Sequence, residues 1–202
     1  MLDGDNGLGA AGGDYAMRQA VEKARVAGVA TVVVRNSNHY ASCFYYPLVA
    51  IAAGMAGMTI TTSGPLTLPT FGMAPMLGTD PYAIGFPGGN VSPPFVIAMV
   101  TSAIAMGKVG IYRREGKTLP DGWTFDKDFQ PTTDPQQARW LNLLGTDRAH
   151  GSHKGIVLNV AGISSAVCSP VGTTVRKCRL AARRCSAQPT CSPHGASMPL
   201  SR

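Results

Sequence analysis

Hydrophobic positions along the chain first follow a helical period and then form a strand-like run. Small apolar residues recur at helical spacing over 15–27, and we expect Asp14 to cap this helix and Gly28 to end it. Residues 29–34 are continuously apolar and mostly β-branched, which predicts a strand buried on both faces. Residues 1–13, rich in Gly and Asp, predict a loop or a strand end. A helix followed by a buried strand is typical of an α/β fold.

The pattern continues with one more helix and further strands, interrupted by a long loop. We predict a helix over 45–56 and strands near 57–62, 81–86 and 94–100. The loop over 63–80 is rich in Pro and Gly, and loops of this length in compact domains tend to carry function or to be disordered.

Regularity weakens towards the C-terminal side. Residues 101–114 are mixed in character, and residues 115–136 are polar and broken by prolines. A short helix is predicted to start after Lys154 and to run to about Ser165. We therefore divide the chain into a partial α/β domain over 1–165 and a tail over 166–202.

The tail differs from the domain in composition. It is rich in Arg, Cys, Ser and Pro, contains no acidic residue and has no helical or strand period, so we expect it to be disordered. A frameshifted reading frame would also produce such an abrupt change, an alternative that peptide mass data across residues 160–175 would test.

The net charge is concentrated in this tail. The chain carries 18 Lys and Arg against 11 Asp and Glu, and six of the basic residues lie beyond Val167. The domain is thus nearly neutral, and its charge does not indicate an anionic partner. Binding of nucleic acid or an anionic surface through the tail is an alternative, but the tail lacks interleaved aromatic residues, and we expect no nucleic-acid partner.

The cysteines and the first residues of the chain indicate the cellular compartment in which the protein is expected. Cys43 is the single cysteine of residues 1–165, and the tail cysteines are not spaced in the pairs that bind zinc, so no metal is expected. Acidic residues follow Met1 where a signal peptide needs basic ones, and no apolar run reaches the ~20 residues of a membrane span. We expect a cytoplasmic protein with free thiols and no membrane association.

His39 is the first candidate for chemistry. It lies in the polar run Arg35–Tyr40, directly after the predicted strand, and ligands of α/β proteins bind at strand ends. Histidine side chains in general exchange protons near neutral pH, which suits removal of a hydroxyl proton while hydride leaves the adjacent carbon. A hydrogen-bonded loop histidine is the alternative that His39 alone leaves open.

Further stretches along the chain give His39 a context. Together they resemble the malate/L-lactate dehydrogenase family, and they follow one another in that family's order. They are Arg35–Tyr40 (RNSNHY), Tyr45-Tyr46, Ala52–Gly54, Met58–Pro65 (MTITTSGP), Leu77–Pro81 (LGTDP), Ala98–Ser102 with Gly107-Lys108, Leu119–Trp123, Thr132–Pro135 and Gly151–Gly155 (GSHKG).

The resemblance implies a fold, a reaction and a set of site residues. The fold would be a family-specific, non-Rossmann mixed sheet flanked by helices, in agreement with the absence of a G-x-G-x-x-G motif opening a helix. The reaction would be hydride transfer between NAD or NADP and a small 2-hydroxy acid, carried out by a homodimer. By resemblance, His39 is the acid/base. The same comparison assigns Ser63, Met99, Thr101 and Lys154 to the cofactor, and Ser37, Asn38 and Thr79 to the substrate.

The chain departs from the family's pattern at three positions and at both ends. Ala98 stands where the family usually has Asp, Asp80 where it has Asn, and Ala41 where it has Gly. We expect Asp80 to repel a substrate carboxylate if it faces one, and Ala41 to be strained if its φ is positive. The resemblance begins part-way into the family's pattern and stops near Ser165, which predicts an incomplete sheet. A catalytically inactive fragment is therefore the alternative to an active dehydrogenase.

Overall fold

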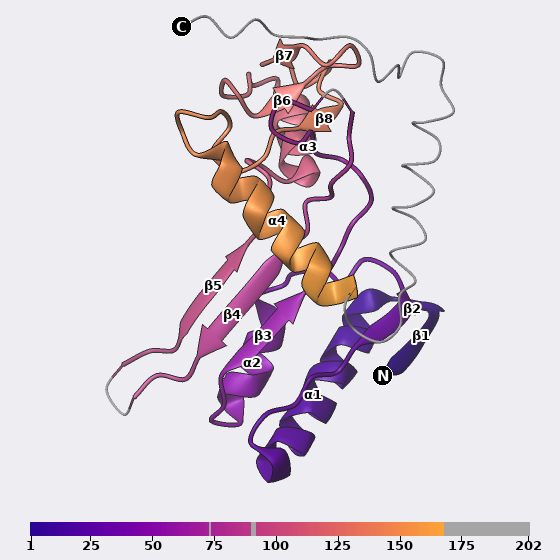
Figure 1. The fold of residues 1–202 in the computed structure, drawn as a ribbon, viewed down its shortest axis with the longest axis vertical. Helices are drawn as coiled ribbons and strands as arrows, with labels where there is room; N and C mark the ends of the chain where they lie inside the picture. Colours follow the sequence, from indigo (N-terminus) through magenta and orange to yellow (C-terminus); the bar gives the residue numbers. More distant parts are fainter. Residues whose placement is uncertain (73, 90–91, 168–202) are drawn as a thin grey trace, which may run out of the picture.

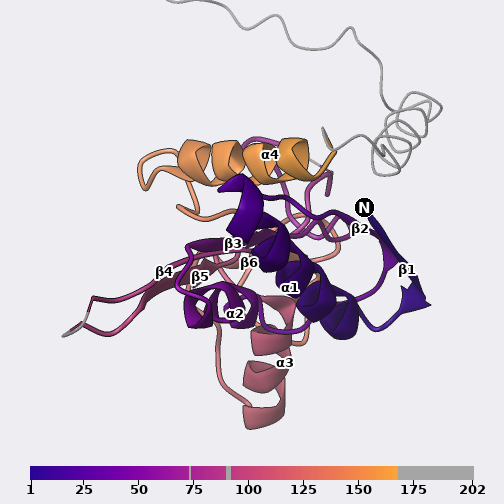
Figure 2. The ribbon, with the colours of Figure 1, turned by 90° about the horizontal axis from the view of Figure 1, so that it is seen from below.

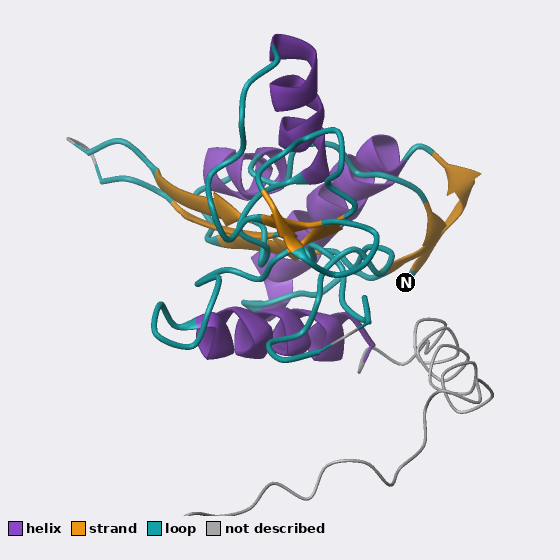
Figure 3. Cartoon of the chain, turned by 90° about the horizontal axis from the view of Figure 1, so that it is seen from above, coloured by secondary structure: helices purple, strands orange, loops and turns teal. Residues whose placement is uncertain are grey.

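Helices and small β-sheets alternate along the described residues, which are 1–72, 74–89 and 92–167 of this computed structural model. Within them, helices flank a central layer of strands, so the predicted α/β class is confirmed (Figures 1 and 3). Parallel and antiparallel pairings lie in separate small sheets. Of the predicted tail over 166–202, residues 166 and 167 end a helix, and residues 168–202 lie outside the described residues, so the predicted disorder of the latter stays a prediction.

The first unit pairs the two strands that flank helix α1. Strands β1 (Leu2–Gly7) and β2 (Val34–Ser37) are parallel, and α1 (Gly9–Ala27) connects them. α1 ends at Gly28, whose φ of +82° suits glycine, as predicted.

Three expectations for this region were wrong. The helix begins at Gly9, not near residue 15, and Asp14 lies inside it rather than at its cap. Gly13 is needed there because a Cβ would overlap the ring of Tyr46, whereas a Cβ at Gly12 would make only ordinary contacts with β2. The run 29–34 is not a doubly buried strand: Val29 is 79% exposed, and only Val34 of this run belongs to β2.

The second sheet carries the loops that form the site. Strands β3 (Gly57–Ile60), β4 (Tyr82–Phe86) and β5 (Phe95–Met99) are antiparallel in the order β3-β4-β5, close to the predicted ranges. Helix α2 (Tyr45–Ala52), predicted over 45–56, packs on one face, where a side chain at Gly57 or Gly85 would overlap it. Helix α4 (Ser152–Val167) lies across the opposite face (Figure 2).

The third unit packs around helix α3 (Met106–Glu115). The two-residue strands β6 (Thr124–Phe125), β7 (Pro131–Thr132) and β8 (Trp140–Leu141) form an antiparallel sheet in the order β7-β6-β8. These strands were not predicted, because two-residue strands carry too few positions to set up an alternating pattern.

The main buried apolar cluster fills the space beside this small sheet. It consists of Ile104, Val109, Leu119, Ala138 and Leu141. No helix of the described part of the chain is long and apolar enough to cross a membrane.

Candidate active site at the strand ends

The loop between β3 and β4 is closed by side chains at its two ends. The backbone N–H of Ser63 donates to Oδ1 of Asp80 at 2.7 Å, and the N–H of Thr79 donates to Oγ of Ser63 at 2.8 Å. The hydroxyls of Ser63 and Thr79 lie 3.3 Å apart. A Cβ on Gly78 would overlap Asp80 and Ser63, so only glycine fits beneath this pair. The loop thus presents two hydroxyls side by side.

Thr101 and Asn159 hold this loop from behind. The Thr101 hydroxyl donates to the carbonyl oxygen of Thr79 at 3.0 Å. The amide of Asn159, on α4, donates to the carbonyl oxygen of Gly78 at 3.0 Å and to Oγ1 of Thr101 at 2.7 Å. Thr101 and Asn159 are both fully buried. Four segments distant in sequence therefore meet in one polar network.

Asp80 is an unusual member of the network because its side chain is buried. It is 1% exposed, and its Oδ2 has no hydrogen-bond partner within the described residues. Burial raises the pKa of the Asp80 carboxyl, and hydrogen bonds from the Ser63 backbone and the Asn159 side chain offset part of that effect. The carboxyl points into the protein, so it does not stand at the surface where it would repel a substrate.

Lys154 lies in the first turn of α4. Its side chain is exposed and passes over Gly151, and its backbone N–H donates to the Gly151 carbonyl oxygen at 2.8 Å. Gly155 is required at the next position because a Cβ there would overlap the backbone of Leu144. The absence of a side chain at Gly155 therefore lets the start of α4 pack directly against the backbone of Leu144.

His39 lies in a second group of predicted residues, at the end of β2. Ser37, Asn38 and His39 are exposed. The side-chain amide of Asn38 donates to the carbonyl oxygens of Asn6 at 2.6 Å and Gly7 at 3.2 Å, and so ties β2 to the end of β1.

The imidazole of His39 has one nitrogen engaged by the protein. Its Nδ1 accepts a hydrogen bond from the backbone N–H of Ala41 at 3.0 Å, so the proton of the neutral ring lies on Nε2. Ala41 has a φ of +62°, the strained conformation that was expected if glycine is replaced there.

Tyr46 supports the turn that follows His39. Its buried ring stacks on Tyr40, with centroids 5.0 Å apart, and its hydroxyl donates to the Tyr40 carbonyl oxygen. Burial raises the pKa of Tyr40 well above its usual range and also raises the pKa of the free thiol Cys43. Both groups are therefore neutral near pH 7.

The two groups of site residues are joined through Tyr82. The Cys43 thiol, four residues after His39, contacts the Tyr82 carbonyl oxygen at 3.9 Å. The Tyr82 hydroxyl donates to the sulfur of Met99 at 3.0 Å, at the end of β5. The chain thus brings Ser63, Thr79 and Thr101 into direct contact, with Met99 connected to the His39 loop.

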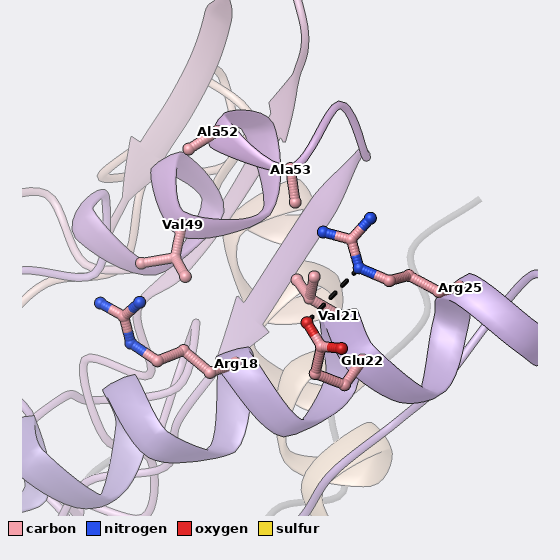
Figure 4. Close-up of a pocket in the computed structure, with 7 residues that line it drawn as sticks. All are labelled: Arg18, Val21, Glu22, Arg25, Val49, Ala52 and Ala53. Carbon is pink, nitrogen blue, oxygen red and sulfur yellow. Dashed lines mark hydrogen bonds and ion pairs between the residues drawn. The ribbon is translucent and has the colours of Figure 1, made fainter.

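A surface hollow lies elsewhere, between α1 and α2 (Figure 4). Its arginines already have carboxylate partners: Arg18 pairs with Asp14 at 2.9 Å and Arg25 with Glu22 at 3.4 Å. None of the predicted site residues lines it.

The sequence analysis did not single out Asn159. A polar residue inside the apolar stretch 156–163 is a signal that could have found it, because an amide in such surroundings needs buried partners.

Comparisons with known proteins agree with the resemblance. Residues 1–166 match the family described as malate/L-lactate dehydrogenase. The chain is 39% identical over 164 residues to a malate dehydrogenase of Pyrococcus horikoshii, covering 79% of this chain and 45% of that protein. It is 37% identical over 188 residues to an L-sulfolactate dehydrogenase of Methanocaldococcus jannaschii, covering 92% of this chain and 53% of the relative.

Solved structures give the same answer. The crystal structure of a malate dehydrogenase from Entamoeba histolytica superposes with a TM-score of 0.73 at 37% identity, covering 79% of this chain and 46% of that one. The chain spans about half the length of the relatives it matches. On the family match and these similarities together, the chain belongs to the malate/L-lactate dehydrogenase family.

Proposed function

We propose that this protein is an oxidoreductase that transfers a hydride between NAD or NADP and a small 2-hydroxy acid of the malate or lactate type. The observation that carries the proposal is the meeting of Ser63 and Thr79, from the β3–β4 loop, with Thr101, from the segment after β5, beneath helix α4, whose first turn carries Lys154. Family membership supplies the reaction type.

The residues present fit a nicotinamide dinucleotide. Ser63 and Thr79 offer hydroxyls at the sheet edge, and Lys154 offers a cation at the start of a helix, where the peptide dipoles also favour a phosphate. When bound, the nicotinamide ring is the group that carries the hydride. We assign Ser63, Met99 and Lys154 to contact the cofactor. Thr101 instead holds the Thr79 carbonyl, because it is buried and its hydroxyl is engaged by Thr79 and Asn159.

His39 is our proposed proton-transfer residue. With Nδ1 accepting from Ala41, the neutral ring carries its proton on Nε2, which can donate a hydrogen bond to a substrate carbonyl oxygen. Taking up a hydroxyl proton at Nε2 requires the ring proton to move to Nδ1 and the Ala41 bond to open. Ser37 and Thr79 are the proposed substrate contacts. Asn38 was also predicted to bind substrate, and a contact through its side-chain N–H groups competes with its bonds to Asn6 and Gly7. A cytoplasmic homodimer acting on a small 2-oxo acid, with either NAD or NADP, completes the proposal.

A catalytically inactive member of the family is the second candidate. The exposure of Ser37, Asn38 and His39 to solvent favours it, because an exposed site does not exclude water from the reaction.

The deciding assay follows NADH or NADPH absorbance with pyruvate, oxaloacetate and related 2-oxo acids. Turnover by the wild type that is abolished in His39→Ala but kept in His150→Ala, an exposed histidine paired with Asp147, supports the dehydrogenase. Absence of turnover with every pair of cofactor and oxo acid supports the inactive member.

A further inference from the structure

We propose that Asn159 is a positioning residue, which sets the peptide groups of Gly78 and Thr79 and fixes their placement relative to Lys154. The proposal rests on the proposed function, because it concerns how the assigned cofactor contacts are held together. It adds a residue that lies outside every motif that identified the family.

The first support is the cost of placing an amide there. Asn159 is 0% exposed and lies in the middle of α4 between Leu158 and Val160. Asparagine is a poor helix former, and a buried amide without partners is strongly unfavourable. The two N–H groups of Asn159 both donate to the strand-end loops, while its Oδ1 is buried without a hydrogen-bond partner within the described residues.

The second support is what those two hydrogen bonds hold. One N–H binds the Gly78 carbonyl oxygen directly. The other binds the Thr101 hydroxyl, which in turn donates to the Thr79 carbonyl oxygen. Asn159 thus orients two successive peptide groups, and the side chain of Thr79 projects from between them towards Ser63.

The third support is the position of Asn159 on its helix. Lys154 precedes it by five residues, which corresponds to about 7.5 Å along the helix axis and to a rotation of roughly 140°. Lys154 is therefore exposed while Asn159 is buried. The hydrogen bonds of Asn159 fix both the rotation and the axial position of α4. They therefore also fix the point on the helix from which the Lys154 side chain extends.

The loop itself does not depend on Asn159 for its fold. The Thr67 hydroxyl also lies 3.0 Å from the carbonyl oxygens of both Leu77 and Gly78 and shares its one proton between them, and the Ser63 and Asp80 bonds close the loop independently. In Asn159→Leu, the Gly78 carbonyl keeps one donor and the Thr101 hydroxyl keeps its acceptor. We therefore expect this variant to fold while its cofactor contacts lose their alignment.

The test is a fluorescence titration of the full chain with NADH and with NADPH, together with thermal unfolding. Asn159→Leu is expected to raise the dissociation constant of the better-bound cofactor by about tenfold or more. The matched control is Thr124→Val, which removes a similarly buried hydroxyl that donates to the Thr132 carbonyl oxygen within the third sheet and not to Gly78, Thr79 or Thr101. The control is expected to lose similar stability and to keep wild-type affinity.

A second variant covers the case in which Asn159→Leu fails to fold. Asn159→Asp has the same shape, loses both N–H donors when ionised and regains one donor when protonated. The buried carboxyl of Asp80 titrates beside this side chain in both proteins, so the affinity is compared with that of the wild type at each pH. The affinity of Asn159→Asp relative to wild type is expected to recover as the pH falls from 8 to 5.

Two outcomes would overturn the assignment. Affinity in Asn159→Leu equal to that of Thr124→Val, or a pH-independent ratio in Asn159→Asp, overturns it and leaves the proposed function standing. Failure of the wild-type chain to bind either cofactor overturns both.

Discussion

The backbone N–H of Ser63 donates a hydrogen bond to the carboxylate of Asp80 across 17 residues of sequence, and this bond closes the loop between β3 and β4. The acceptor is a buried carboxyl whose second oxygen has no partner within the described residues. The bond therefore stabilises the loop, while burial of the carboxyl opposes folding whenever it is ionised.

The first prediction concerns Asp80 and pH. Because burial raises its pKa, the folded protein holds the proton more tightly than the unfolded chain does. The contribution of Asp80 to stability is thus present at low pH and is lost as the pH rises through the raised pKa. Asp80→Asn removes this titration and keeps an oxygen acceptor for Ser63, so we expect it to stabilise the protein at pH 7 by about 1 kcal/mol.

The gain in stability of Asp80→Asn should shrink as the pH falls towards 3.8, the ordinary aspartate pKa. The wild-type carboxyl then becomes protonated in the unfolded chain as well. Urea unfolding of both proteins at pH 7 and near pH 4 measures the difference. An equal difference at the two pH values would show that the charge of Asp80 is not its cause.

The second prediction concerns Gly78. A methyl group there would overlap both Asp80 and Ser63, so we expect Gly78→Ala to lower the free energy of unfolding by about 1–3 kcal/mol. Gly64→Ala is the control, because a Cβ at Gly64 meets no atom within 4 Å, and its effect should stay within about 0.5 kcal/mol. Denaturant unfolding compares the two, and equal losses would contradict the packing explanation.

The third prediction concerns the support of the His39 loop. Tyr46→Phe keeps the buried ring and removes the hydrogen bond to the Tyr40 carbonyl, and we expect a loss of about 1 kcal/mol. Amide hydrogen exchange over residues 40–44 should become faster, because this turn loses an anchor. Tyr45→Phe removes an exposed bond to Asp14 and should leave that exchange unchanged. Unchanged exchange in Tyr46→Phe would remove Tyr46 from this supporting role.

The fourth prediction concerns the β4–β5 hairpin. Phe86 and Phe95 are paired across it and are 47% and 60% exposed, so the wild-type chain should bind an apolar dye such as ANS there. Replacing both with Ser should reduce dye fluorescence and change the free energy of unfolding by no more than about 0.5 kcal/mol. Val96→Ser, on the opposite face beside Gly85, should instead destabilise the sheet. Dye binding that survives the double replacement would locate the exposed apolar surface elsewhere.

Much of the order of elements could be read from the sequence. The strands near 57–62, 81–86 and 94–100 and the end of α1 at Gly28 follow from local periodicity and from the conformational freedom of glycine, which short segments express by themselves. The family also followed from the sequence, because its landmarks are short runs in a fixed order. The local pattern predicted the wrong start for α1, because packing of Gly13 against Tyr46 extends the helix towards the N-terminus. It also predicted the wrong strand over 29–34, because the strand is set by the pairing with β1, which begins only at Val34.

The site shows the same division. The sequence by itself identified His39, Ser63, Thr79, Thr101 and Lys154 as candidates, since each lies in a recognisable run. Only the tertiary structure turned Asp80 into the interior and brought Asn159 to Gly78 across 81 residues. The physical reason is that burial and hydrogen bonding of these two side chains depend on segments far away along the chain, and no local pattern records which segments will meet.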